Sequence, residues 1–355
     1  MKQHQPKLTS EVKLLQAIVA GMGRNIKAYY EISDANGQVV KGESKSLLKN
    51  FALIMQSFFN ATNPVCKNTA NGNVTLGTVT RNWGFTQGIV SSAGVCVSGT
   101  GVGAISSDNY GMGTLYQTTG AVTFSTDTDT SDAFQFSVYQ SIVASSSTTI
   151  NEVGFIAKML QSASQTTSDI LLIRDLVSPG FATTIGVAYT IKFTISFSTG
   201  ADSYLTNLAQ IWRGIMAGQN ETIVNKQGGS SLLGIRTKSG SQSNGLIAAK
   251  SAITFGTGST APLMDDYALV AEVAESISVD ESIITNDTTR YKWQNYQAVA
   301  FNNSYTLAEM ALEMYLYDYT FVSKEVFAAR CLISPTIAVV AGDGVLGKFI
   351  HDIAI

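Results

Sequence analysis

Residues 50–59 read NFALIMQSFF, and residues 207–216 read NLAQIWRGIM, 157 positions further along the 355-residue chain. The glycine motif GTG at 99–101 returns at 256–258 with the same offset. Further pairs keep this offset: Asp108 with Asp265, Tyr110 with Tyr267, Tyr139 with Tyr296, Gln140 with Gln297, and Glu152 with Glu309. A single register that persists over so many positions indicates a tandem duplication.

The register changes once, by a single residue. The segment IRDLVSP at 173–179 corresponds to ARCLISP at 329–335, at an offset of 156. The repeat therefore divides the chain into an N-terminal arm (1–23), a first module (24–197) and a second module (198–355). A chain of this length also suits two domains of ordinary size better than one.

Each module is expected to be mainly β, with one helix near its start. Apolar side chains alternate over 26–32 and precede Asn36-Gly37, which is a strong signal for a hairpin turn. Residues 47–58, and their copy at 205–215, place apolar side chains at helical spacing. We therefore expect one amphipathic helix in each module, packed on a sheet.

The remaining segments read as strands separated by turns. Residues 122–143 and their copy 291–301 alternate apolar and polar side chains. Residues 189–198 (YTIKFTISFS) occupy the place where a hairpin of the second module would stand, so the two modules should adjoin without a linker. This pattern predicts two tandem β-sandwich or jelly-roll-like domains, each with one packed α-helix.

The arm contains an apolar stretch at 12–23 (VKLLQAIVAGMG). It is too short to cross a bilayer, which takes about 20 residues, and it lacks a convincing cleavage site. The spacing of Leu14, Leu15, Ile18 and Val19 predicts a short amphipathic helix. Two roles stay open: the arm docks on its own domain, or it reaches a neighbouring subunit.

The composition restricts the partners. Charged residues make up 14% of the chain, against about 25% in typical domains, and the net charge is −3. Such a chain has no basic face for nucleic acid, and no segment predicts a membrane span. Its three cysteines are widely spaced, without a metal-binding pattern. We expect no cofactor and no metal.

The sequence offers little for catalysis. Its only histidines are His4 and His351, near opposite ends of the chain, and no nucleophile elbow, zinc-protease motif or phosphate-binding loop occurs. We therefore expect no enzymatic activity and assign no catalytic residue. Both modules do keep a glutamate within an apolar run and an arginine downstream, and a buried charge needs a partner. The predicted structural pairs are Glu152 with Arg174 and Glu309 with Arg330.

Two other motifs have ordinary interpretations. The glycines of the GTG motifs predict turns, because glycine supplies a positive φ, and Asp108 and Asp265 predict turn or capping residues. The run 127–132 (DTDTSD) resembles part of a calcium loop, but it lacks the sixth-position glycine and the final glutamate. A solvated loop is the default interpretation there.

The order of the motifs resembles that of structural proteins of tailed viruses, found in phages, archaeal viruses and proviral genes. The resemblance covers nearly the whole chain, once per module, and departs at LAEMAL, where a glycine is missing. The motifs are KAYYEISDANGQVV, SLLKNFALIMQSFF, GTGSTAPLMDDYALVAEV, INEVGFIAK, ILLIRDLVSP and YTIKFTISF.

The resemblance implies a β-sandwich component of the virion: a capsid decoration, collar, tail or baseplate protein. Such a protein would form homo-oligomers and bind other virion proteins. Three alternatives stay open. One is a host- or glycan-binding surface adhesin, for which Trp83, Trp212 and Trp293 would face solvent. Another is an extracellular filament or surface-layer subunit with the arm as a donated strand. The last is an enzyme such as a glycan hydrolase.

Overall fold

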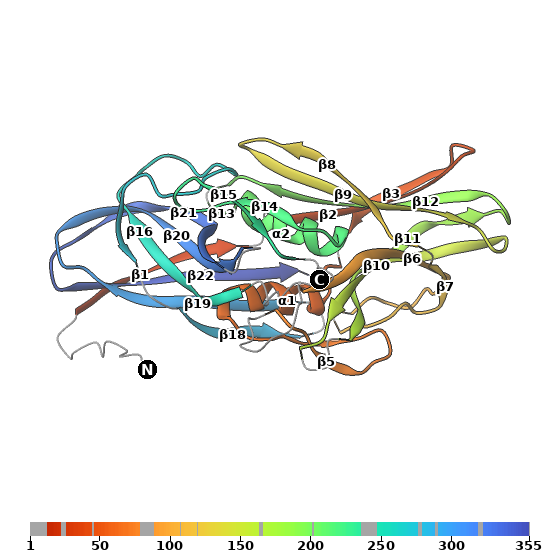
Figure 1. Ribbon diagram of the computed structural model, residues 1–355, viewed down its shortest axis with the longest axis horizontal. Helices are drawn as coiled ribbons and strands as arrows, with labels where there is room; N and C mark the ends of the chain where they lie inside the picture. The colour runs from red at the N-terminus through yellow and green to blue at the C-terminus, as the bar shows by residue number, and fades with distance from the viewer. Residues whose placement is uncertain are drawn as a thin grey trace.

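The computed structural model describes residues 13–22, 26–44, 46–78, 89–106, 108–118, 120–162, 166–200, 202–235, 247–275, 279–287, 290–318 and 322–354. The predicted fold class is confirmed, because the chain is mainly β with two helices (Figure 1). The first half contains β1 (Lys13–Met22), β2 (Ile26–Asp34), β3 (Val39–Ser44), α1 (Lys49–Asn60), β4 (Val65–Lys67), β5 (Asn73–Thr75), β6 (Val90–Gly99), β7 (Leu115–Thr118), β8 (Thr123–Asp129), β9 (Ala133–Val143), β10 (Thr148–Leu160), β11 (Thr167–Thr183) and β12 (Ala188–Ser198). The second half contains β13 (Asp202–Tyr204), α2 (Thr206–Ala217), β14 (Glu221–Val224), β15 (Ser230–Leu233), β16 (Ile247–Gly256), β17 (Glu272–Glu275), β18 (Asp280–Asn286), β19 (Arg290–Ala300), β20 (Tyr305–Tyr317), β21 (Ser323–Val339) and β22 (Asp343–Ala354).

The sheets repeat between the halves. In the first half the strand orders are β3-β2-β12-β9-β8 and β11-β10-β6-β7. In the second half they are β1-β22-β19-β18, in which β1 comes from the start of the chain, and β13-β21-β20-β16-β17. The strands that correspond in the repeat thus occupy corresponding places in the sheets. The sandwich arrangement and the module boundaries stay predictions.

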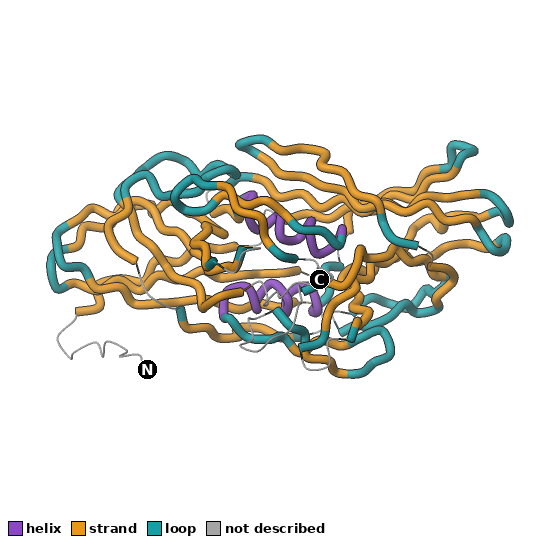
Figure 2. Tube along the Cα trace, in the orientation of Figure 1, coloured by secondary structure: helices purple, strands orange, loops and turns teal. Residues whose placement is uncertain are grey.

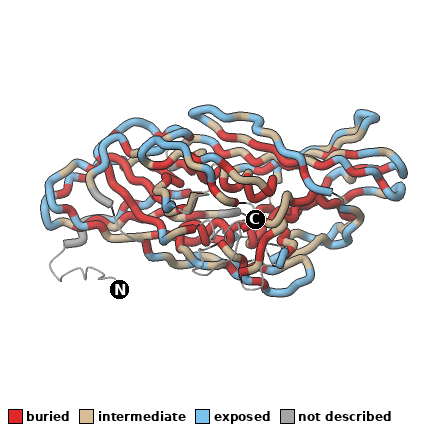
Figure 3. The backbone as a smooth tube through the Cα atoms, in the orientation of Figure 1, coloured by how far each residue is buried: buried red, intermediate tan, exposed pale blue. Residues whose placement is uncertain are grey.

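The core runs through both halves: buried residues lie inside the molecule, and exposed residues lie along its outer edges (Figure 3). Phe155 of β10 and Phe193 of β12 join the two sheets of the first half, with ring centroids 6.3 Å apart. One hydrophobic cluster contains these rings and also the buried rings of Phe255 and Phe349 in the second half. The two halves therefore share one continuous core.

The N-terminal arm is not the short helix that its apolar spacing predicts. Residues 13–22 form β1, which pairs in parallel with β22 of the same chain. Its side chains alternate: Ile18, Ala20 and Met22 are buried, while Val19 is exposed. The periodicity of a short apolar run does not distinguish a helix from a strand. Here the backbone of residues 13–22 pairs with β22, which stabilises the strand.

β1 takes the place that the hairpin occupies in the first half. There β2 pairs with β12, and in the second half β1 pairs with β22, the strand that corresponds to β12. β12 ends at Ser198 and β13 begins at Asp202. The second half therefore has no hairpin of its own, and the arm covers the edge that this leaves.

The two helices lie at the middle of the elongated molecule, between the strands of the two halves (Figure 2). α1 contacts β16 and β19 of the second half, and α2 contacts β6 and β9 of the first half. Phe51 of α1 stacks on Trp212 of α2, with ring centroids 3.9 Å apart and planes at 11°. Each helix therefore packs on its own half and also on the other half. We call the region where α1 and α2 meet the opposite half the junction.

The contacts across the junction follow the repeat. Gln56 and Arg213 occupy corresponding positions on the two helices. The hydroxyl of Tyr291 donates to Gln56 Oε1 at 2.7 Å, and the Arg213 guanidinium lies over the ring of Phe134, 5.3 Å from its centroid. Phe134 and Tyr291 correspond as well, so the junction has approximate two-fold symmetry.

Gly218 should be intolerant of any side chain. It ends α2 with φ of 64°, and a Cβ there would lie 2.0 Å from the backbone nitrogen of Ala93 in β6. Gly218→Ala should therefore lower the free energy of unfolding by about 2–3 kcal/mol, through strain and overpacking. The matched control is Ala61→Gly, since Ala61 ends α1 with φ of 53° and corresponds to Gly218. Urea unfolding should show almost no loss for this control, and equal losses at both positions would contradict the contact.

Candidate functional site

The strongest polar feature of the first half is a buried ion pair between adjacent strands. Glu152 lies on β10 and Arg174 on β11, and both side chains are buried. Arg174 Nη2 lies 2.6 Å from Glu152 Oε2, and Arg174 Nε donates to the same oxygen at 2.7 Å. The structure thus brings together the two residues that the sequence singles out.

The carboxylate of Glu152 also holds a loop. It accepts backbone N–H groups from Gly101 at 3.2 Å, Gly113 at 3.1 Å and Thr114 at 2.8 Å. Burial alone would raise the pKa of Glu152, but the hydrogen bonds from Thr114 and Gly113, together with Arg174, hold that pKa below its usual value. Glu152 therefore stays ionised and fixes both ends of the loop 100–114 between β6 and β7.

The second half repeats this arrangement. Arg330 Nη2 lies 2.7 Å from Glu309 Oε2. The carboxylate accepts N–H groups from Gly258 at 3.1 Å, Val270 at 3.0 Å and Ala271 at 3.3 Å. Glu309 therefore fixes the corresponding loop 257–271 between β16 and β17.

The glycines of the GTG motifs serve this carboxylate rather than a tight turn. A Cβ at Gly99 would lie 2.4 Å from Glu152 Oε1, and a Cβ at Gly256 would lie 2.5 Å from Glu309 Oε1. The φ values of Gly99 and Gly256 lie outside the left-handed region. The prediction that these glycines supply a positive φ is wrong, because their role is to leave room for the glutamate.

The residues that follow Asp108 and Asp265 supply further partners for the two arginines. The side chain of Asn109 accepts from Arg174 Nη1 at 2.8 Å, and Asp266, its counterpart, forms an ion pair with Arg330. Burial would lower the pKa of Arg330, but Asp266 and Glu309 raise it. Asp108 instead pairs with Lys49 at 3.2 Å. Each arginine also donates to a loop carbonyl: Arg174 Nη2 to Gly103 O at 3.4 Å and Arg330 Nη2 to Thr260 O at 3.0 Å.

These clusters are built for rigidity. Every partner of Glu152 and Glu309 among the interactions given above is a hydrogen-bond donor, which suits an anchor. Within the described ranges no group of three or more His, Cys, Asp or Glu side chains could hold a metal ion. The run 127–132, interpreted from the sequence as a solvated loop, belongs in part to β8, which ends at Asp129. Asp127 accepts hydrogen bonds from Ser125 at 2.6 Å and from Ser137, and it lies 3.7 Å from Lys192.

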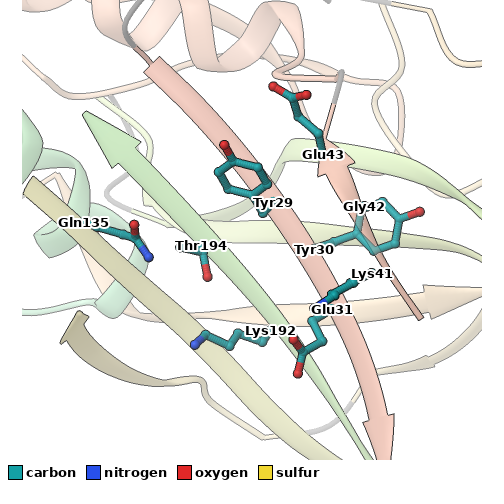
Figure 4. A pocket seen from close by; sticks show the side chains of 9 residues that line it. All are labelled: Tyr29, Tyr30, Glu31, Lys41, Gly42, Glu43, Gln135, Lys192 and Thr194. Atoms are coloured by element: carbon teal, nitrogen blue, oxygen red, sulfur yellow. The ribbon is translucent and has the colours of Figure 1, made fainter. Parts of the chain in front are cut away.

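An open groove lies on the outer face of the first-half sheet (Figure 4). Its volume is about 400 Å³, and it lies over β2, β3, β9 and β12. Its lining is polar and carries both signs of charge: Tyr29, Tyr30, Glu31, Lys41, Gly42, Glu43, Gln135, Lys192 and Thr194. The groove could not be predicted from the sequence, because its residues come from four separate strands, β2, β3, β9 and β12.

His351 is buried in an aromatic stack at the junction. Its ring lies 4.7 Å from Trp293 and 4.8 Å from Phe59 of α1, measured between centroids. Its Nδ1 shares a hydrogen bond of 2.7 Å with the hydroxyl of Tyr204. Burial lowers the pKa of His351 from 6.5 to about 3, so the ring is neutral at ordinary pH.

The stability of the protein should therefore fall in acid. Above pH 6.5 His351 is neutral in both states, so its contribution is fully present there. As the pH falls from 6.5 toward 3, the unfolded chain takes up a proton and the folded chain does not, which costs roughly 1.4 kcal/mol per pH unit.

The control is the double variant His351→Phe with Tyr204→Phe, which removes the titrating ring and its hydroxyl partner. Between about pH 7 and about pH 5, the wild type should lose roughly 2 kcal/mol more than this variant in urea unfolding. Equal slopes would show that His351 does not titrate as proposed.

The tryptophans expected on an adhesin surface are mostly inside. Trp212 and Trp293 are both fully buried, and Trp83 lies outside the described residues. All three cysteines are buried too, and none is in a disulfide. The aromatic side chains of the described residues thus give no exposed tryptophan platform for a glycan.

Comparison with protein-family models, with characterised proteins and with solved structures finds no match to this chain. Neither helix among the described residues is long and apolar enough to span a membrane.

Proposed function

We propose that this protein is a structural component of a virion, such as a capsid decoration, collar, tail or baseplate subunit. It acts by self-association and by binding other virion proteins, and it carries out no reaction. The order of motifs in both modules supports this proposal, as does the use of buried charge to fix loops. The proposed location is the virion. The alternatives, an adhesin or a filament or surface-layer subunit, would be extracellular or on the cell surface.

The observation that carries the proposal is the pair of anchored loops. Both loops present apolar side chains to solvent although a buried carboxylate fixes their backbone. Val102 is 76% exposed, and Val270 is 63% exposed; Leu263 and Tyr267 are exposed as well. Exposed apolar groups favour association, and a rigid loop loses little entropy on binding. The loops thus suit a contact surface.

The duplication gives this surface twice in one chain. The halves share a core and a two-fold junction, so both loops belong to one rigid block. Such a block can occupy two quasi-equivalent positions, and three copies of it could imitate a hexamer. That symmetry is common in rings and lattices and supports a role in assembly.

The test measures self-association of the purified full-length chain by light scattering and native mass spectrometry at increasing protein concentration. We expect discrete oligomers, weakened by Val102→Asp and by Val270→Asp. Val143→Asp is the matched control, because Val143 is 59% exposed but lies at the end of β9, away from the loops. A monodisperse monomer at high concentration that binds no other virion protein would contradict the proposal.

A host- or glycan-binding adhesin is the second candidate, and the groove of Figure 4 favours it. Tyr29 offers a ring, and Glu31 and Glu43 offer acceptors for sugar hydroxyls. A glycan array would test this role: a hit that disappears in Tyr29→Ala but persists in Phe124→Ala supports it. Phe124 is a suitable control, since it is exposed on β8 and is not among the lining residues.

A further inference from the structure

A second polar cluster lies in the second half, apart from the glutamate–arginine pairs. Lys226, in the turn between β14 and β15, places its Nζ 2.8 Å from Glu313 Oε1 of β20. The same Nζ lies 3.0 Å from each carboxylate oxygen of Glu272, the first residue of β17. Thr254 of β16 donates a hydrogen bond to Glu313 Oε1 as well. One amine and two carboxylates from three separate elements thus meet in one place.

The protein shields this cluster from water most completely at Glu313. The side chain of Glu313 is fully buried, that of Lys226 is 13% exposed and that of Glu272 is 34% exposed. The Lys226 ammonium also lies over the buried ring of Phe327, 5.8 Å from its centroid. Burial penalises both charges of an ion pair, and transfer of a proton from the amine to the carboxylate removes that penalty. The site therefore favours the neutral amine and the neutral acid more than water does.

The turn that carries Lys226 is held in place by its own backbone contacts. Lys226 N donates to Glu325 O of β21 at 2.8 Å. The side chain of Asn225 accepts from Gln227 N at 3.0 Å and from Gly229 N at 2.9 Å, which closes the turn. The fold thus holds the amine against the carboxyl group. Two groups held in contact in this way react with an effective concentration of about 10⁵–10⁸ M.

The fold does not need this cluster, because the first half is built without it. The positions that correspond to Lys226, Glu272 and Glu313 hold Thr69, Leu115 and Ile156. Ile156 and Val97, which corresponds to Thr254, belong to a small buried apolar cluster. The glutamate–arginine pairs, by contrast, occur in both halves. A polar cluster present in one half only, where apolar packing is sufficient in the other, indicates a purpose other than folding.

We propose that Lys226 and Glu313 form an amide bond with each other, which cross-links the β14–β15 hairpin to β20. This bond does not depend on self-association and goes beyond the role proposed above. It forms once in each chain and converts no outside substrate. Since Glu272 directly follows the anchored loop 257–271, the cross-link strengthens the part of the second half that carries this contact surface.

The atoms of this condensation balance within the cluster. Transfer of one proton from Lys226 to the carboxylate of Glu313 gives a neutral amine and a neutral acid. The lone pair of the amine attacks the carboxyl carbon of Glu313, while Thr254 stabilises the negative charge that develops on Oε1. Glu272 takes a proton from the nitrogen and returns it to the departing hydroxyl, so the C–O bond breaks and water leaves. One ammonium and one carboxylate become one amide and one water.

The test is intact-mass spectrometry of the purified full-length chain, denatured after incubation in the folded state until its mass is constant. We expect a chain that is lighter than its sequence by the mass of one water. Peptide mapping should find a branched peptide that joins the segments around Lys226 and Glu313. Lys158 and Asp169 provide the control in the same digest. Their atoms also lie 2.8 Å apart, but Asp169 is 41% exposed, so its charge is solvated and this pair should stay unlinked.

Two variants separate the amide bond from an ordinary ion pair. Lys226→Arg keeps a cation beside Glu313 and should retain the full mass of its sequence. Glu272→Gln removes the group that carries the proton, so the bond should form about 100-fold more slowly. Cooperative urea unfolding checks that both variants are folded. An unchanged rate in Glu272→Gln would exclude this role for Glu272.

The outcome that overturns the proposal is a folded wild-type chain that keeps the full mass of its sequence. A loss of water that maps to other residues, or that persists in Lys226→Arg, overturns it as well. None of these results depends on assembly, which light scattering measures separately. The failure of this proposal is therefore distinct from the failure of the proposed function.

Discussion

Replacing Glu309 with alanine should lower the free energy of unfolding by about 3–5 kcal/mol. Arg330 would then lose a buried partner that lies 2.7 Å away. The N–H groups of Gly258, Val270 and Ala271 would lose their acceptor at the same time. A buried donor without a partner costs its full desolvation energy. Urea unfolding measures the loss, and hydrogen exchange should rise across residues 257–271.

The chain provides its own matched comparison. Glu152→Ala should cost a similar amount, because Glu152 holds the corresponding loop through the same kinds of contact. Asp169→Ala should cost less than about 1 kcal/mol, since Asp169 is 41% exposed in its pair with Lys158. A small loss at Glu309, comparable to the loss at Asp169, would show that the carboxylate is not an anchor.

Trp212→Ala should also cost about 3–5 kcal/mol, the usual range for removing a large buried aromatic side chain. Trp212 is fully buried, stacks on Phe51 at 3.9 Å and meets Phe58 at 5.8 Å between ring centroids. Both phenylalanines belong to α1 of the other half. The cavity would therefore open at the junction rather than inside one half.

The location of the damage is the sharper readout for Trp212→Ala. Because the halves share a core, hydrogen exchange should rise in β10 of the first half and in β20 of the second half. Trp212→Phe, which keeps a ring on Phe51, should show a smaller effect in the same places. Loss of protection confined to α2 and the second half would mean that the halves are independent domains.

The anchors could be predicted because the repeat exposes them. A glutamate within an apolar run is weak information by itself, but Glu152 and Glu309 occur at the same place in both copies, each with an arginine downstream. Burial of a charge demands a partner, and the structure places an arginine within 2.7 Å of each. The role of Gly99, which leaves room for Glu152, could not be predicted, since a sequence does not show which side chain will lie against a glycine.

The junction could not be predicted, because helical periodicity shows that a face is buried and not what covers it. The apolar faces of α1 and α2 read as packing on their own sheets, whereas Phe51 and Trp212 meet across the halves. The prediction of a helix in the N-terminal arm was wrong for a related reason. Its partner β22 lies at the opposite end of the chain, and local spacing over 13–22 carries no information about an open edge so distant in sequence.

The most direct test of the proposed role is a cryo-electron microscopy reconstruction of the native particle that contains this chain. The account predicts density for the two-module block at repeated positions in a ring or on a lattice. The loops 100–114 and 257–271 should lie at contacts between subunits. Purified particles that lack this chain, or that carry it only as an isolated copy without contacts to other subunits, would contradict the account.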